Sequence, residues 1–314
     1  MRFSIIIPLY NKAPYIKKAL DSVISQTFKD YELIVVDDGS VDESYEVARE
    51  FLERLGIIYN LIRQPNSGVS MARNLGASLS AGDYLCFLDA DDWWAPNFLE
   101  KMNEFIREYP EAGIYGTNYF YIKNGRKRVC VTNAKTGYID YCKTYVEKLQ
   151  MPLWTGAVCL SRTIFKEFGG FKPHLCLGED FDLWIRIALK YKVAFLNEPL
   201  SYYCQDSNPK WRLVGKLHDP SRHILWNIDY LSEEEKKNPD YKLLIDSLRA
   251  YSLLPYYLSK QYNIAAKTEL AKIDWSQLPK SEHLKYSQPL FLLKVKMRFR
   301  KIGSIIKQWL IKHL

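Results

Sequence analysis

The chain has 314 residues, with 44 Lys+Arg against 36 Asp+Glu and a formal net charge of +8. Eight of the basic side chains and no acidic one lie in residues 283–314, so residues 1–282 are neutral. A neutral body argues against a general nucleic-acid-binding protein, whose cations spread over a face or groove. The 47% apolar and 25% charged residues are typical of a folded globular protein.

The six cysteines include no CxxC pair, which argues against a zinc site or a redox motif. The pattern predicts reduced thiols, as in a cytoplasmic protein. The amino-terminal apolar run is too short for a signal peptide. We find no run of the roughly 20 apolar residues that a spanning helix needs.

The first hundred residues alternate short apolar runs with amphipathic stretches. We predict strands at 3–9, 32–36, 57–62 and 83–88, and helices at 13–26, 42–55 and 69–79. This alternating order predicts an α/β fold with a mostly parallel, Rossmann-like sheet flanked by helices.

Further along the chain, the pattern predicts a helix from 96 to about 109 and a hairpin around Asn124-Gly125. A helix at 179–190 and two short strands between 193 and 204 follow. From residue 209 the segments become charged, amphipathic and interrupted by prolines. We therefore expect one domain at 1–208 and a helical C-terminal region at 209–314.

Carboxylates follow two of the predicted strands, as Asp37-Asp38 and as Asp89-Ala90-Asp91-Asp92. Ligands of open parallel sheets bind beyond the carboxyl ends of the strands, so these five acids should share one rim. Their repulsion is relieved by a hard divalent cation, Mn²⁺ or Mg²⁺, which also bridges to phosphates. Neither GxGxxG nor GxxxxGK[ST] is present, so metal and side chains must neutralise the phosphates of a bound nucleotide.

Several runs together resemble family 2 glycosyltransferases of the GT-A type, over about residues 3–205. They are IIIPLYN at 5–11, VVDDGSVD at 35–42, QPNSGVSMARN at 64–74, FLDADD at 87–92, GGF at 169–171 and GEDFDLW at 178–184. The resemblance implies a nucleotide-sugar donor whose binding set is Pro8, Tyr10, Asp37, Asp38, Asn66, Gly68, Arg73 and Asp89.

Within that set, the resemblance implies that Asp38 accepts a hydrogen bond from a base imide, which favours UDP. Asp37 either assists it or caps the loop. Arg73 meets the base or the diphosphate, Asp89 the ribose, and Asp91 the metal.

The resemblance also implies that Asp180 is the catalytic base that deprotonates the acceptor hydroxyl. Glu179 and Trp154 lie on the acceptor side, although a packing role for Trp154 is an equal alternative. Many family members carry a histidine ligand after the last core strand. Here Asp206 stands in the corresponding run, either as a replacement metal ligand or in an unrelated loop.

These features predict an inverting, metal-dependent transfer of a sugar to a saccharide or lipid-linked saccharide acceptor in cell-surface polysaccharide synthesis. A sugar-phosphate nucleotidyltransferase is one alternative, but it needs a glycine-rich loop after the first strand. A catalytically inactive, membrane-associated scaffold is the other, and the presence of Asp91 and Asp180 argues against it.

The C-terminal segment at 290–314 has apolar residues at helical spacing and basic residues mainly on the other side. A basic amphipathic helix of this kind binds an anionic membrane surface. The alternative is a terminal helix docked on the protein. The first reading predicts a cytoplasmic enzyme that is peripheral at the inner face of the membrane.

Overall fold

The computed structural model describes residues 1–55, 58–208, 210 and 216–295. Contacts divide the chain into two compact units, Met1–Ile228 and Asp229–Leu314. The division lies later than the boundary expected at 208, because the end of the first unit packs onto its body. Ile224, Leu225 and Ile228 are buried, and the Ile224 amide donates to the Leu177 carbonyl at 3.1 Å.

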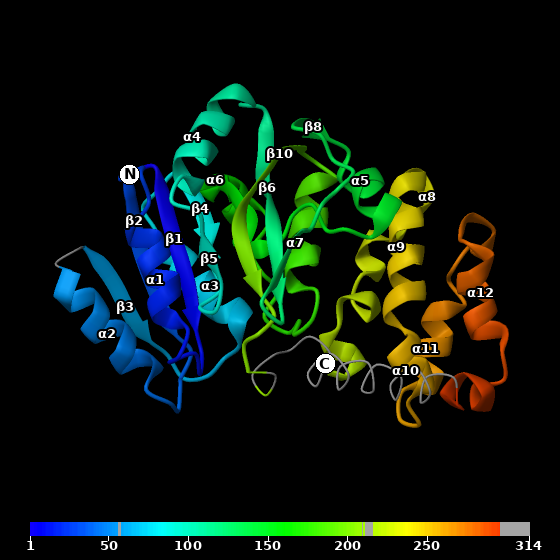
Figure 1. The fold of residues 1–314 in the computed structure, drawn as a ribbon. Coiled ribbons are helices and arrows are strands. Elements are labelled where there is room, and N and C mark those ends of the chain that lie inside the picture. Colours follow the sequence, from blue (N-terminus) through cyan, green and yellow to red (C-terminus); the bar gives the residue numbers. More distant parts are fainter. Residues whose placement is uncertain (56–57, 209, 211–215, 296–314) are drawn as a thin grey trace. The chain divides into compact units, whose positions relative to one another are not determined.

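The first unit is built on a ten-stranded sheet of order β3-β2-β1-β4-β9-β6-β10-β5, with β7 pairing β6 and β8 pairing β10 (Figure 1). The strands are β1 (Phe3–Leu9), β2 (Tyr31–Asp37), β3 (Tyr59–Arg63), β4 (Tyr84–Phe87), β5 (Trp93–Trp94), β6 (Ala112–Lys123), β7 (Arg126–Val129), β8 (Gly137–Ile139), β9 (Val158–Ser161) and β10 (Lys192–Cys204). The pairs among β3, β2, β1 and β4 are parallel, as is β6 with β10. The remaining pairs are antiparallel, so the predicted α/β sheet is mixed.

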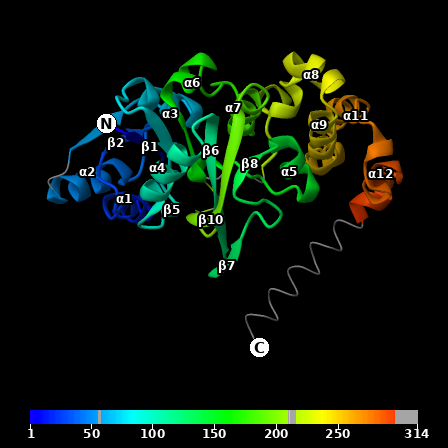
Figure 2. The same ribbon diagram turned by 90° about the horizontal axis from the view of Figure 1, so that it is seen from above.

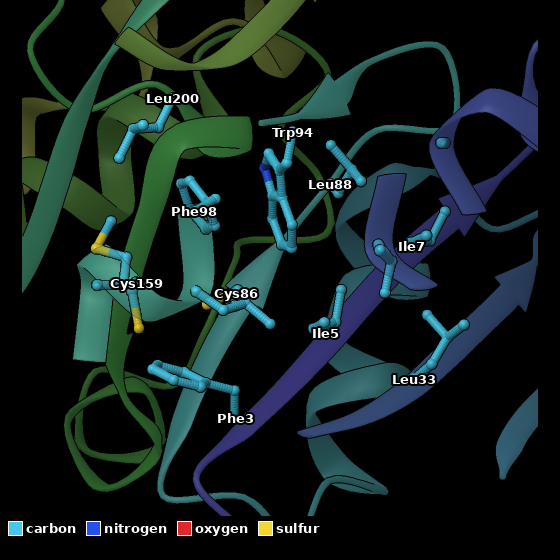
Figure 3. Packing of buried hydrophobic residues seen from close by; sticks show 14 of the residues in the cluster. Phe3, Ile5, Ile7, Leu33, Cys86, Leu88, Trp94, Phe98, Cys159 and Leu200 are labelled. Carbon is cyan, nitrogen blue, oxygen red and sulfur yellow. The ribbon is translucent and has the colours of Figure 1, made fainter. Parts of the chain in front are cut away.

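Strand β1 is buried along its whole length, which explains its run of three isoleucines. Phe3, Ile5 and Ile7 belong to one large core cluster, part of which is drawn in Figure 3. Side chains alternate between the two faces of a strand. Ile6 accordingly lies on the opposite face, where a Cβ on Gly76 would meet its Cγ2 at 2.5 Å.

Helices cover both faces of the sheet. They are α1 (Ile16–Ile24), α2 (Ser44–Leu55), α3 (Val69–Ser78), α4 (Phe98–Glu108), α5 (Tyr141–Lys148), α6 (Arg162–Glu167) and α7 (Glu179–Ala188). Buried residues of α1, α2 and α4 join the cluster around Ile5. On the other face, Phe87 of β4 contacts Phe165 of α6 and Phe171, which in turn contacts Trp184 of α7.

Two strand predictions differ from the structure. The two short strands expected between 193 and 204 form the single strand β10, whose register against β6 shifts around Leu196, Pro199 and Ser201. Strand β9 inserts antiparallel between β4 and β6 in a region for which no strand was predicted. The predicted hairpin is confirmed: Asn124 and Gly125 both have positive φ, and β6 and β7 project beyond the neighbouring strands (Figure 2).

The second unit is helical, with α8 (Ser232–Lys237), α9 (Pro239–Ser252), α10 (Leu254–Leu258), α11 (Asn263–Leu270) and α12 (Lys280–Ser287). Arg249, 1% exposed, pairs there with Glu235, Asp246 and Glu269. Residues 290–295 are helical, whereas 296–314, most of the expected amphipathic segment, lie outside the described residues. Among the described helices, none is long and apolar enough to cross a membrane.

Gly178 directly precedes helix α7 and packs closely against Ile224, near the end of the first unit. Its φ is +81°, and a Cβ there would meet Ile224 Cγ2 at 2.3 Å. Gly169 also has a positive φ, +71°, but has nothing within 4 Å of a Cβ position. Alanine substitutions at these two glycines therefore distinguish the cost of backbone strain from the cost of steric overlap.

We expect Gly169→Ala to lower the free energy of unfolding by about 1 kcal/mol, the cost of a left-handed alanine. Gly178→Ala should cost about 3 kcal/mol, because Ile224 must also move. Urea unfolding of both variants measures the difference. Equal losses would show that Ile224 moves away freely.

Candidate active site

A cavity of about 600 Å³ opens at the carboxyl ends of β1 and β4. It brings together most of the predicted site residues: Pro8, Tyr10, Asp38, Asn66, Gly68, Arg73, Asp89, Asp91, Trp154, Glu179 and Asp180. Asp37 and Asp206 are not in its lining. Pro8 and Asp180, 172 positions apart, thus meet where the sheet geometry predicts a ligand site.

Hydrogen bonds within the protein position Asp38. Its carboxylate accepts from the Ser67 and Gly68 amides, both at 2.8 Å, and from Gln64 Nε2 at 2.7 Å. Asn66 Nδ2 donates to the Asp38 carbonyl. Asp38 therefore holds the loop that precedes α3, and each carboxylate oxygen has two acceptor sites of which Oδ2 uses one for Gly68.

Asp37, at the end of β2, is fully buried. Its carboxylate pairs with Arg63 Nε at 3.0 Å and accepts from the Ser40 amide. Burial raises its pKa, and the Ser40 hydrogen bonds and the Arg63 charge oppose that rise. Of the two alternatives for Asp37, the structure shows the loop-capping contact.

Arg73 of α3 is the central cation of the cavity. Its guanidinium donates to Asp89 Oδ1 at 2.7 Å and to Glu179 Oε1 at 3.0 Å, and lies against the Phe171 ring. The side chain is only 4% exposed. The next residue, Asn74, exchanges hydrogen bonds with both backbone groups of Phe171. The sequence runs at 64–74 and 169–171 therefore contact each other in the folded protein.

Asp180 and Glu179 occupy the first turn of α7. Burial raises the pKa of Asp180, opposed by the charge of Arg73 and by hydrogen bonds from the Phe181 amide and Thr155 Oγ1. Burial and the charge of Asp180 raise the pKa of Glu179 to about 7, despite Arg73. Asp180 accepts from a neutral hydroxyl and has no ion-pair partner among the described residues, whereas Glu179 is held by a guanidinium.

Asp182 has a different part in the same helix. It is fully buried and pairs with Lys172 Nζ and Arg186 Nη2, both at 2.8 Å. Arg186 also donates to the carbonyls of Phe168 and Gly170. Asp182 therefore anchors the loop that carries Phe171.

The run from Asp89 to Asp92 forms a tight turn, closed by a hydrogen bond from the Asp92 amide to the Asp89 carbonyl. Asp92 is buried and accepts from the Cys204 amide at 2.7 Å. Burial and the charges of Asp91 and Asp89 raise its pKa well above the usual range. Asp91 pairs with Lys12 Nζ at 2.5 Å.

Two of the predicted side chains have contacts that favour structural roles. The Asp206 carboxylate accepts from the amides of Asn124 and Gly125, so it caps the β6–β7 turn outside the cavity lining. This contact corresponds to the alternative of an unrelated loop and gives no support to Asp206 as a metal ligand. Trp154 reaches the cavity wall but is 5% exposed, and its ring packs against Tyr119 and Tyr203.

The sequence reasoning missed several lining residues. Lys12 directly follows the run at 5–11, and Thr155 directly follows Trp154. Their position next to predicted site residues was the signal that could have identified them. Beyond the last strand, a further set lines the wall: Gln205, Ser207, Lys210, Lys216, His218 and Arg222. Its basic residues lay in the region assigned to the C-terminal appendage, where no motif marked them.

Solved structures with this fold exist at low sequence identity. S. aureus TarS 1–349 in complex with UDP-GlcNAc superposes with a TM-score of 0.73 and 18% identity, over 98% of this chain and 92% of that one. Mannosyltransferase PcManGT from Pyrobaculum calidifontis, in complex with GDP-Man and Mn²⁺, gives 0.52 and 17%, over 86% and 85%. The GT-A-like fold, including helices after the sheet domain, is thereby confirmed.

Curated relatives match part of the chain. Glycosyltransferase GlyA of Streptococcus pneumoniae serotype 4 is 42% identical over 120 residues, 38% of this chain and 17% of that protein. An uncharacterized glycosyltransferase of Rickettsia felis is 30% identical over 235 residues, 74% of this chain and 36% of that protein. The chain thus spans about a sixth of the first relative and little more than a third of the second. Residues 4–167 match the family model for glycosyl transferase family 2, and the chain therefore belongs to that family of glycosyltransferases.

Proposed function

We propose that the protein transfers a sugar from a UDP-linked donor to a saccharide or lipid-linked saccharide acceptor, with inversion and with the aid of a divalent cation. The observation that carries this proposal is the shared cavity. Asp180 and the acid run at 89–92 line this same cavity. Arg73 joins Asp89 of that run to Glu179, the neighbour of Asp180. The UDP-GlcNAc complex of S. aureus TarS supports the choice of donor.

The site residues fit nucleotide binding. Asp38 retains an acceptor site on Oδ2 for a base imide. Ser70, in the first turn of α3, has a buried hydroxyl with no hydrogen-bond partner among the described residues, and it lines the cavity. A helix amino terminus with a spare donor attracts anionic oxygens. These groups suit the base and phosphates of a nucleotide.

The residues also fit a divalent cation. The described His, Cys, Asp and Glu side chains form no group of three placed to hold a metal. Mg²⁺ and Mn²⁺, however, are often held by one or two carboxylates together with substrate phosphates. Asp91, together with the phosphates of the donor, would hold the cation, as the Mn²⁺ in the PcManGT complex supports. When bound, the cation would neutralise charge on the departing diphosphate.

The chain's own residues would carry the remaining chemistry. Asp180 takes the proton of the acceptor hydroxyl while the hydroxyl oxygen bonds to the anomeric carbon of the donor sugar. The bond from that carbon to the diphosphate breaks in the same step. Attack opposite the leaving group inverts the configuration. Arg73 holds Glu179 and Asp89 in place on either side. The proposal includes an acceptor from cell-surface polysaccharide synthesis and docking of residues 290–314 on an anionic membrane surface.

Family membership removes the support for a nucleotidyltransferase, which also needs a glycine-rich loop that Leu9-Tyr10-Asn11-Lys12 does not supply. The scaffold alternative predicts no turnover. Turnover of a UDP-sugar by the wild-type protein would therefore refute it.

Asp180→Asn should lower transfer, or hydrolysis of the UDP-sugar, at least about 100-fold, because amide cannot act as a base. Its dissociation constant for UDP should stay within about threefold of the wild type, because the ground-state contacts remain. Steady-state kinetics and calorimetry measure the two quantities. Asp182→Asn is the matched control on the same helix and should lower stability instead. Unchanged turnover in Asp180→Asn would remove it as the base.

Thr155→Val should shift the acid limb of the kcat/KM profile to higher pH. The hydroxyl stabilises the ionised form of Asp180, so its loss raises the pKa of that carboxyl and leaves more of it protonated at low pH. Thr155→Ser keeps the hydroxyl and should retain the wild-type limb. Identical profiles for the Val and Ser variants would contradict the assignment of this limb to Asp180.

Chelation with EDTA should reduce turnover at least about 100-fold, with recovery on adding Mn²⁺ or Mg²⁺. Asp91→Asn should not recover at the metal concentration that restores the wild type. Asp206→Asn should recover fully, because its carboxylate contacts the hairpin turn. Full turnover in EDTA would refute the metal requirement.

A further inference from the structure

Lys12 lies at the junction of two loops that line the cavity. Its amide donates to Ser44 Oγ at 2.7 Å, and its carbonyl accepts from the amides of Tyr15 and Ile16 at the start of α1. The preceding residue, Asn11, accepts from the Val41 amide through its side chain. The backbone of Lys12 is therefore fixed, and its side chain crosses the cavity wall to Asp91.

The ion pair between Lys12 Nζ and Asp91 Oδ2 measures 2.5 Å, with side chains only 14% and 13% exposed. Water screens such a pair less than it screens one on an open surface. Asp89 is instead held by Arg73, and Asp92 accepts a backbone amide. Asp91 is thus the carboxylate of this run whose cationic partner is a lysine, a single charge on a flexible stem.

We propose that Lys12 occupies the cation position beside Asp91 in the free protein and gives it up when a nucleotide diphosphate binds. This inference rests on the proposed metal role of Asp91. A divalent cation that reached Asp91 alone would separate Lys12 from its partner and place two cations side by side. A diphosphate offers the ammonium group new anionic oxygens. Metal and nucleotide binding are therefore coupled, with Lys12 as a positioning residue.

Lys12 thereby disfavours loading of the cavity with metal in the absence of donor. The coupling is reciprocal, so the metal strengthens nucleotide binding by the same factor. A residue that merely stabilised the loop would affect both states of the protein equally. The ratio of Mn²⁺ affinities with and without UDP is therefore the decisive quantity.

Electron paramagnetic resonance of free Mn²⁺, titrated with and without UDP, measures this ratio. Lys12→Met should bind Mn²⁺ about tenfold more tightly than wild type without UDP, and the tightening caused by UDP should shrink by about the same factor. Lys17→Met, which removes one exposed cation of α1, is the matched control and should behave as wild type. Lys12→Gln repeats the measurement should the Met variant fail to fold.

Unchanged or weaker Mn²⁺ binding by the Lys12 variants, relative to Lys17→Met, would overturn the inference. Asp91→Asn separates this failure from that of the proposed function. If wild type binds Mn²⁺ in the presence of UDP and Asp91→Asn does not, the metal site stands and only the role of Lys12 falls. If wild type with UDP binds no Mn²⁺, or Asp91→Asn binds it equally, both proposals fall.

Discussion

The buried guanidinium of Arg73 is the interaction on which the cavity depends. It joins α3, the end of β4 and the start of α7 through Asp89 and Glu179, residues 16 and 106 positions away in the sequence. Removing it would leave the Glu179 carboxylate, 12% exposed, and the Asp89 carboxylate, 30% exposed, without their counter-charge close to Asp180. Loss of one partner of a buried ion pair costs roughly 3–5 kcal/mol. The same side chain therefore stabilises the fold of the site and fixes the positions of its acids.

Neighbouring carboxylates of the cavity differ in their hydrogen-bond and ion-pair partners. Glu179 is tied to a cation, Asp182 to two, and Asp38 to backbone amides, so each is held in one orientation. Asp180 accepts from a hydroxyl and an amide and faces the cavity. Burial raises its pKa while Arg73 opposes the rise, which balances basicity against ionisation. The helix positions Asp180 at the cavity, and the ion pairs around it hold the neighbouring acids in other contacts.

The fold class and the gathering of most predicted site residues at one cavity were predictable, because parallel strands bring their carboxyl ends to one edge and the motifs follow those ends. Contacts between distant side chains were not. Asp206 lies next to the site in sequence, but its carboxylate turns to the Asn124-Gly125 hairpin. Lys12 and Thr155 acquire their importance only from partners 79 and 25 positions away. Strand β9 was missed because its antiparallel insertion depends on β4 and β6, not on its own pattern.

The charges that line the cavity are local and do not reflect the net charge of the protein. The body that contains it is neutral, since the net charge of +8 resides in residues 283–314. The cavity wall nevertheless combines acids with the cations Lys12, Arg73, Lys210, Lys216 and Arg222. A polyanionic donor needs no basic field over the whole surface when single cations are placed at the points where its charges lie. Local pairing also offsets the repulsion between these acids, as the ion pair between Lys12 and Asp91 illustrates.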